Sequence, residues 1–404
     1  MTSSSTSPRA AAPAYLGTPV LLLMAMATGL CAGSNYFNQP LLHSIALGLG
    51  TTDAAAALTV TLSQVAYACG LFLLVPLADK LERRGLAVGL MLLAALGLFL
   101  SGYAQHIGML VAGTMITGLF SVAAQTLVPM AATLSDPQRS GRAVGLVMSG
   151  LLTGILVARS VAGLLSAVGS WHTVYRAAGA LMVGVAAVLW WALPASRNPV
   201  PMGSGRLLRS LGGLALRHPR LRSRSLIGAL AFASVSVLFS TMALLLSGPG
   251  HRMTDVGIGL VGLVGVAGAL TATVAGRLAD RGWGQWTTAG SVLLLVLSWA
   301  ALWLGIASLG WFLLGVLLID IALPGVHISN QNVIYRLELQ ARSRINAVYM
   351  TSYFAGAAAG SALGALVWRT AGWPGACLLG ALLAVLCGLA LLHDRRLARH
   401  DAAQ

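Results

Sequence analysis

Long apolar runs constrain this chain more than any other feature. Spanning a lipid bilayer as an α-helix takes about 20 mostly apolar residues, and twelve such runs follow one another along the sequence. Hydrophobic residues make up 57% of the chain and charged residues only 9%, whereas a soluble domain is about a quarter charged. The chain is therefore predicted to be an all-α membrane protein. The expected spans are 16–38, 57–78, 86–103, 107–131, 142–168, 172–194, 225–247, 256–278, 286–306, 310–331, 345–368 and 372–393.

Parts of the first half of the chain recur in the second half. The tripeptide Leu-Ala-Asp ends at Asp79 and again at Asp280. Other matches, each separated by half the chain length, are Arg142 with Arg344, Gly154 with Gly356 and Trp171 with Trp373. Duplicated helical units with a substrate site at the repeat interface are typical of secondary transporters. We therefore expect two pseudo-symmetric six-helix halves.

Composition divides the chain further. The first residues are rich in Ser, Thr, Ala and Pro and lack the regions of a signal peptide. Residues 195–224 combine Pro, Gly and Arg, which is the composition of a linker on a membrane surface. The expected organisation is a disordered cytoplasmic tail at 1–15, a first half at 16–194, a basic cytoplasmic linker at 195–224, a second half at 225–393 and a cytoplasmic tail at 394–404.

The basic residues set the expected orientation, because short loops rich in Lys and Arg stay in the cytoplasm. Only Arg176, Arg252 and Arg369 fall on the other side under these spans. Both termini are thus expected to be cytoplasmic, in the inner membrane. Topology and anionic lipid headgroups account for the net charge of +15, so nucleic-acid binding is not expected.

A family resemblance rests on a loop motif and on polar positions within the spans. The residues that carry it are 75–84 (VPLADKLERR), its echo 276–281 (GRLADR), 35–40 (NYFNQP), Arg159, Asp320 and 330–331. They resemble the major facilitator superfamily, and more narrowly a bacterial branch of drug and metabolite efflux permeases. The resemblance implies a twelve-helix fold that alternates access by rocking its halves, and proton-driven export. The chain departs from the family pattern at Val75, Glu82 and Thr114.

The repeated motif predicts a cytoplasmic gate. A carboxylate at a helix end can accept hydrogen bonds from Arg and from free amides at a neighbouring helix N-terminus. The alternative is that these charges only set topology. The expected gating residues are Asp79, Arg83, Arg142, Asp280, Arg281 and Arg344.

Glycines at four-residue intervals carry a second expectation about motion. Small residues at this spacing let helix backbones approach closely. The resemblance implies that their helices lie between the halves, where they would let the halves slide; tight packing without a mechanism is the alternative. These glycines are Gly150 and Gly154 in one span and Gly356, Gly360 and Gly364 in another, with Gly259, Gly262, Gly265 and Gly268 as a weaker set.

Charges inside the bilayer are the sharpest site candidates, since each is costly and normally faces a cavity or a partner. Arg159 and Asp320 are the two that fall deep in the expected spans. Asp320, His327 and Gln331 share one helical face. We expect the charges of Arg159 and Asp320 to pair with each other. With His327, they are expected to couple transport to protons. A fixed structural ion pair is the alternative.

Other polar residues fit a central pocket, since amides and phenols orient a ligand on an otherwise apolar wall. The expected substrate-binding residues are Asn35, Tyr36, Asn38, Gln39, Gln64, Tyr67, Gln125, Asp320, His327, Gln331, Tyr349 and Tyr353. The sequence thus favours a monomeric exporter of a small organic compound by proton antiport. A proton-coupled uptake symporter is the alternative, and a receptor or scaffold would need a larger soluble domain. No catalytic pair, metal site or cofactor motif points to an enzyme.

Overall fold

Helices make up most of the part of the chain that the structure describes. The structure is a computed structural model, and it describes residues 16–136, 140–196, 204–265, 283–338 and 341–403. The first half contains α1 (Thr18–Gly33), η1 (Ser34–Tyr36), η2 (Gln39–Leu41), α2 (Leu42–Gly48), α3 (Asp53–Leu73), η3 (Val75–Asp79), α4 (Arg83–Gly102), α5 (Ile107–Phe120), α6 (Ala123–Thr133), α7 (Ser140–Val168) and α8 (Trp171–Ala192).

The second half follows a surface helix, α9 (Ser204–Arg217). Its elements are α10 (Pro219–Ser247), α11 (Asp255–Val261), η4 (Gly262–Gly265), α13 (Gly284–Leu304), α14 (Leu309–Ile334) and α15 (Arg342–Ala403). Within α15, Gly372 adopts φ 57° and ψ −149°, so two helices meet there. Glycine tolerates this backbone because it has no Cβ.

The described helices cover eleven of the twelve expected spans. Among the described residues, ten stretches are long and apolar enough to cross a membrane, and the last of them, Arg344–Arg399, holds two expected spans on either side of Gly372. The expected span 256–278 is described only as far as Gly265.

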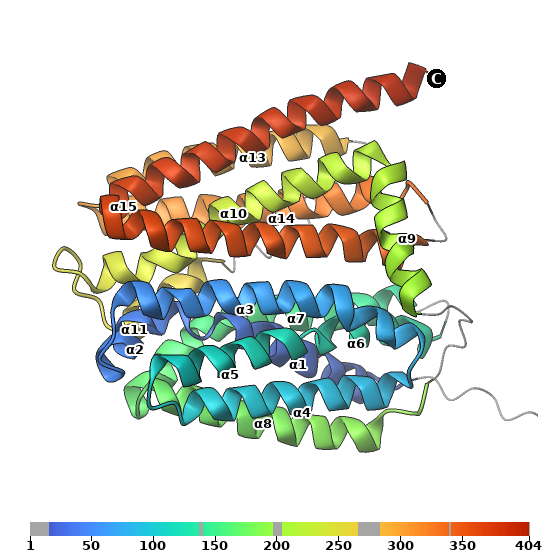
Figure 1. The fold of residues 1–404 in the computed structure, drawn as a ribbon, viewed down its shortest axis with the longest axis horizontal. Helices are drawn as coiled ribbons and strands as arrows, with labels where there is room; N and C mark the ends of the chain where they lie inside the picture. Colours follow the sequence, from blue (N-terminus) through green and yellow to red (C-terminus); the bar gives the residue numbers. More distant parts are fainter. Residues whose placement is uncertain (1–15, 137–139, 197–203, 266–282, 339–340, 404) are drawn as a thin grey trace, which may run out of the picture.

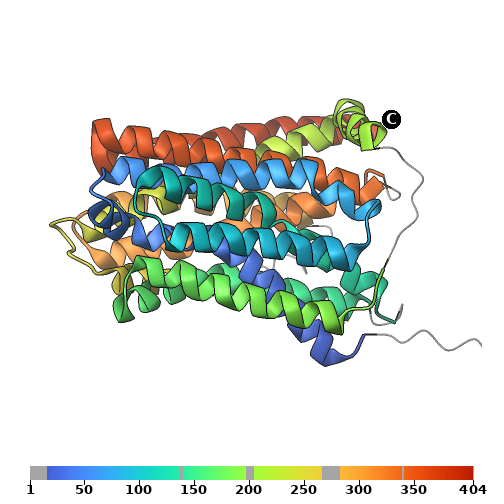
Figure 2. The same ribbon diagram turned by 60° about the horizontal axis from the view of Figure 1, so that its bottom comes forward.

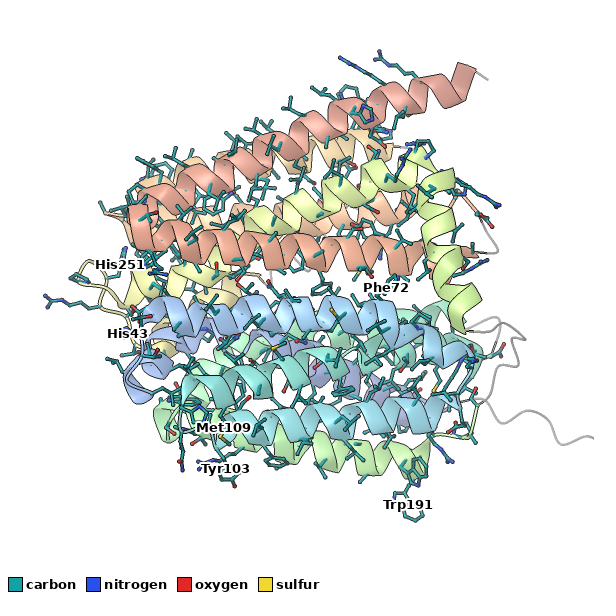
Figure 3. All side chains as sticks on the ribbon, in the orientation of Figure 1. His43, Phe72, Tyr103, Met109, Trp191 and His251 are labelled. Atoms are coloured by element: carbon teal, nitrogen blue, oxygen red, sulfur yellow. The ribbon has the colours of Figure 1, made fainter. Side chains whose placement is uncertain are left out.

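The spanning helices run side by side along one axis (Figures 1 and 2). Helices of the first half, in blue to green, lie together, and those of the second half, in yellow-green to red, lie together. Helix α9 crosses one end of this bundle, and Figure 3 places His43 and His251 at the other end. The fold is thus an all-α bundle of two halves.

Two element boundaries differ from the expected ones. Helix α10 begins at Pro219, inside the expected linker, and α9 occupies part of that linker. Leu211 and Leu214 of α9 are buried, so the segment packs as an amphipathic helix. Helix α15 continues through the expected C-terminal tail, because Asp394 is fully buried among polar partners.

The two stripes at four-residue intervals, Gly150 with Gly154 and Gly356 with Gly360 and Gly364, pack within one half each, contrary to the role that the resemblance implied. A Cβ added at Gly154 would collide with the Gly29 backbone of α1, and one added at Gly356 would collide with the Ala229 backbone of α10. Each stripe therefore joins two helices of the same half. The weaker set does lie between the halves, as expected: a Cβ at Gly259 would lie 2.7 Å from the Arg159 backbone oxygen of α7, and one at Gly163 of α7 would meet the Asp255 backbone.

Candidate functional site

The first span is broken where its polar residues lie. Two 3-10 turns, η1 and η2, separate α1 from α2. Pro40 has no N–H for the α-helical hydrogen-bond pattern, and non-helical backbone at membrane depth is tolerated where protein buries it or it lines a cavity. The break turns Tyr36 and Gln39 toward α7, and both are buried.

Arg159, on α7, lies among residues from both halves. Its Nε donates to Gln39 Oε1 at 2.7 Å. Its guanidinium lies 5.1 Å from the centre of the Tyr36 ring and 3.8 Å from that of Phe239, on α10 of the second half. The side chain is only 4% exposed, so aromatic faces and one amide provide its surroundings.

Asp320, on α14, makes no such contact with the residues that the structure describes. Its Oδ2 is buried and makes no hydrogen bond with any described residue. No ion pair of the described residues joins it to Arg159, although the two charges lie within electrostatic range. The turn η4 contacts both: a Cβ at Gly262 would lie 3.1 Å from Arg159 Cβ, and one at Gly265 would lie 2.8 Å from Asp320 Oδ2.

Aromatic side chains extend the site along α14 and α15. His327 Nδ1 lies 3.1 Å from the Tyr349 hydroxyl, and its ring centre is 4.9 Å from that of Tyr353. Phe354 lies 4.4 Å, centre to centre, from Tyr67 of the first half. These contacts form an aromatic wall that bridges the two halves.

The other expected substrate residues do not all join this site. Gln125 Nε2 donates to the Tyr67 hydroxyl at 3.4 Å, and Gln331 Nε2 donates to Asn346 Oδ1 at 3.4 Å. Gln64 Oε1 is buried without a partner among the described residues. Asn35 and Asn38 line a separate cavity of about 10 Å³ inside the first half, together with Ser34, Ser63, Thr114, Thr117 and Tyr175.

The loop motif is anchored by a residue that departs from the family pattern. Glu82 caps α4 by accepting from the backbone N–H groups of Arg84 and Gly85, and it also accepts from the Ser196 N–H at 2.9 Å. Burial raises the pKa of Glu82, but these backbone donors and the Arg84 charge outweigh it and hold the pKa below its ordinary value. Glu82 thus ties the loop to the end of α8.

The other expected gating residues are only partly described. Arg83 donates to Ala78 O and to Thr133 Oγ1. Arg142 is exposed and Arg344 is half-buried. The Asp79 side chain, Asp280 and Arg281 lie outside the described residues.

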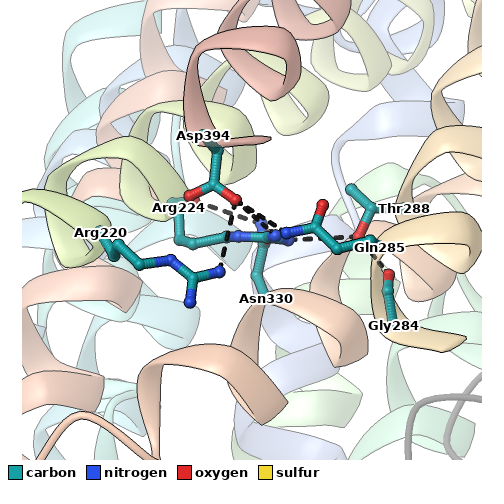
Figure 4. Close-up of polar contacts among 7 residues, drawn as sticks. All are labelled: Arg220, Arg224, Gly284, Gln285, Thr288, Asn330 and Asp394. Atoms are coloured by element: carbon teal, nitrogen blue, oxygen red, sulfur yellow. Dashed lines mark hydrogen bonds and ion pairs between the residues drawn. The ribbon is translucent and has the colours of Figure 1, made fainter. Parts of the chain in front are cut away.

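A buried charged cluster in the second half was not predicted. Arg224 on α10 donates to Asp394 Oδ2 at 2.6 Å, and both side chains are fully buried (Figure 4). Arg220 lies 3.6 Å from the same oxygen, and Gln285 donates to it at 3.2 Å. A signal existed in the sequence: the chain has only ten acidic residues, and Asp394 follows the last span.

Comparison with known proteins decides the family. The model of the Major Facilitator Superfamily matches residues 24–337. The chain belongs to this superfamily. Its members are transporters rather than enzymes, so this superfamily protein is a multi-pass membrane transporter.

Relatives of this superfamily member cover most of its length. It is 47% identical over 371 residues to the transporter YgaY of Escherichia coli O157:H7, covering 92% of this chain and 94% of the relative. The chloramphenicol resistance protein of Streptomyces lividans is 29% identical, over 70% of this chain and 72% of its own. The solved nucleoside transporter NupG superposes with a TM-score of 0.75 over 93% of this chain and 99% of its own, at 14% identity, which shows a shared fold.

Proposed function

We propose that this transporter exports a small organic compound across the cytoplasmic membrane in exchange for protons. The observation that carries the proposal is Asp320, whose buried Oδ2 has no hydrogen-bond partner among the described residues. An ionisable group placed so deep in a membrane protein is costly, and it is normally retained for transport chemistry.

The geometry supports alternating protonation at Asp320. Gln39 and Tyr36 hold Arg159 on the first half, whereas Asp320 belongs to α14 of the second half. The glycine turn η4 lies against both. Rocking of the halves changes the distance between the two charges. Arg159 favours the ionised carboxylate when it is close, and Asp320 takes up a proton when the two separate. His327 lies two turns further along α14 and extends the same path as a neutral ring that donates a hydrogen bond.

The aromatic wall supports a small amphipathic substrate. Rings of Tyr67, Tyr353 and Phe354 offer apolar faces, and amides such as Gln125 offer hydrogen bonds, which is the usual composition of a small-molecule site. The relative from Streptomyces lividans is named for resistance to chloramphenicol, which supports export and makes chloramphenicol a first compound to test.

The remaining proposals concern the moving parts. We propose that residues 16–194 and 225–393 rock as units within one monomer, with both termini in the cytoplasm. We propose that Asp79 and Asp280, together with Arg83, Arg142, Arg281 and Arg344, latch the cytoplasmic gate. Replacing both acids with Asn should then raise labelling of a cysteine at Gln331 by a maleimide from the cytoplasmic side, more than either single change. Equal labelling in all four proteins contradicts the latch.

Proton flux in proteoliposomes tests the function. Purified protein is reconstituted, a panel of small aromatic compounds including chloramphenicol is added, and the internal pH is recorded. Antiport predicts that the substrate and protons move in opposite directions. Movement in the same direction would make the protein an uptake symporter, and substrate movement without proton flux would remove proton coupling.

A further inference from the structure

A chain of hydrogen bonds leads from the buried Arg224–Asp394 pair to His327, and the polarity of each link is determined. The Arg224 side chain has only hydrogen-bond donors. Its Nη2 donates to Asp394 Oδ2 at 2.6 Å. Arg224 Nη1 donates to Thr288 Oγ1 at 3.2 Å. The guanidinium is therefore fixed in position between α13, α14 and α15 (Figure 4).

The next link is Asn330. Its Oδ1 lies 3.1 Å from Arg224 Nη1, and its Nδ2 lies 3.2 Å from the Arg224 backbone oxygen. A guanidinium can only donate and a carbonyl can only accept, so the amide has a single satisfactory orientation. Asn330 is fully buried, where a mismatched amide would cost an unsatisfied hydrogen bond.

That orientation determines what Tyr349 does. Asn330 Nδ2 faces the Tyr349 hydroxyl at 3.4 Å and can only donate to it. Tyr349 is fully buried, and among the described residues its hydroxyl bonds only Asn330 and His327. The phenolic proton therefore has one available acceptor, His327 Nδ1 at 3.1 Å.

We propose that Asp394, Arg224, Asn330 and Tyr349 are positioning residues that hold His327 as the neutral Nε2–H tautomer. His327 then presents an N–H donor beside the Tyr353 ring. The ligand class that follows is a small aromatic compound with an oxygen acceptor, such as a carbonyl. This ligand assignment rests on the proposed transport function, whereas the tautomer does not.

Nitrogen-15 NMR of the histidine rings tests the tautomer directly, because a protonated and an unprotonated ring nitrogen have well-separated shifts. His327→Gln identifies the His327 signals in the reconstituted full-length protein. The proposal predicts an unprotonated Nδ1 and a protonated Nε2. A protonated Nδ1, in either the neutral or the charged ring, overturns it.

Two variants test the chain of bonds. Tyr349→Phe removes only the hydroxyl and keeps the ring that packs on Gly228, and His327 should then populate both tautomers. Asn330→Asp replaces the donor that faces Tyr349 with an acceptor and keeps a partner for Arg224, so the phenolic proton should turn toward the carboxylate and His327 should become the Nδ1–H tautomer. Asn332→Asp, on the same helix, is the matched control and should change nothing. An unchanged tautomer in both Tyr349→Phe and Asn330→Asp overturns the relay.

A pair of probes separates the ligand assignment from the tautomer. Acetanilide carries an aromatic ring and a carbonyl, whereas propylbenzene carries the ring alone. At millimolar concentration acetanilide should shift Nε2 and leave Nδ1 in place, and propylbenzene should shift neither. No shift with acetanilide, or equal shifts with both, overturns the ligand class. Since no transport is measured, these results do not depend on the success of the export assay.

Discussion

At the scale of single residues, Arg159 and Asp320 are buried charges that interact without direct contact. Burying an ionic group costs at least about 2.5 kcal/mol at the centre of a membrane helix. Arg159 offsets that cost through Gln39 and two aromatic faces. Asp320 lacks comparable partners among the described residues, which makes it the group whose charge can change.

A double-mutant cycle measures the coupling of this pair. Arg159→Gln leaves Asp320 without its compensating charge, so the double change with Asp320→Asn should destabilise the protein less than Arg159→Gln alone. Because no direct ion pair exists, we expect a coupling free energy of about 1 kcal/mol in thermal unfolding, near the lower end of measured pairs. Arg176→Gln with Asp320→Asn is the control and should be additive. Additivity in the Arg159 cycle itself would mean that the charges are independent.

At the scale of elements, α7 and α11 hold the halves together at the end opposite α9. Ser160 donates to the Gly259 backbone oxygen at 2.8 Å, and Ser44 of α2 donates to Asp255 Oδ2 at 2.6 Å. Gly163 lies against the Asp255 backbone. A side chain at Gly163 would collide with the Asp255 backbone oxygen, so a larger residue there requires the two helices to separate.

Gly163→Leu should therefore separate this end of the protein. We expect labelling of a cysteine at Ser44 by an impermeant maleimide to rise at least threefold, in a background without native cysteines. Gly145→Leu on the same helix is the control, since nothing lies within 4 Å of a Cβ there. Equal labelling of both leucine variants and the parent would exclude a closed contact at this position.

Glu82 predicts a pH dependence for the anchor between α4 and α8. Its pKa in the folded protein lies below its ordinary value, which is about 4.3 when unfolded. Its stabilisation is therefore complete above that value and is lost as pH falls through the folded pKa. Thermal unfolding should show Glu82→Gln less stable than wild type at pH 7, with the difference narrowing as the pH falls below about 4.3. A difference between Glu82→Gln and wild type that stays constant as the pH falls would contradict the assignment.

At the scale of the whole molecule, the twelve-span fold could be predicted from the sequence because hydrophobicity alone identifies membrane helices. Arg159, Asp320 and His327 could be selected for the same reason, since a charge in an apolar run is conspicuous. The helices that pack against each predicted face could not be predicted from the sequence. The stripe at Gly154 faces α1 rather than the other half, and Asn35 faces a cavity within its own half. Helical periodicity shows which residues share one face of a helix. It does not show which other helix that face contacts. The sequence places Asp394 in a tail, since periodicity does not reveal a partner such as Arg224 that lies far away in the sequence.

The central claim is that protonation of Asp320 couples transport to the proton gradient. The most direct measurement compares Asp320→Asn with Asp53→Asn, a matched change at a partly exposed carboxylate that faces His43, in proteoliposomes loaded with a transported compound. Asp320→Asn should lower pH-gradient-driven transport at least tenfold while equilibrium exchange of the compound persists, and Asp53→Asn should retain both. Gradient-driven transport that survives in Asp320→Asn at the wild-type rate would contradict the account.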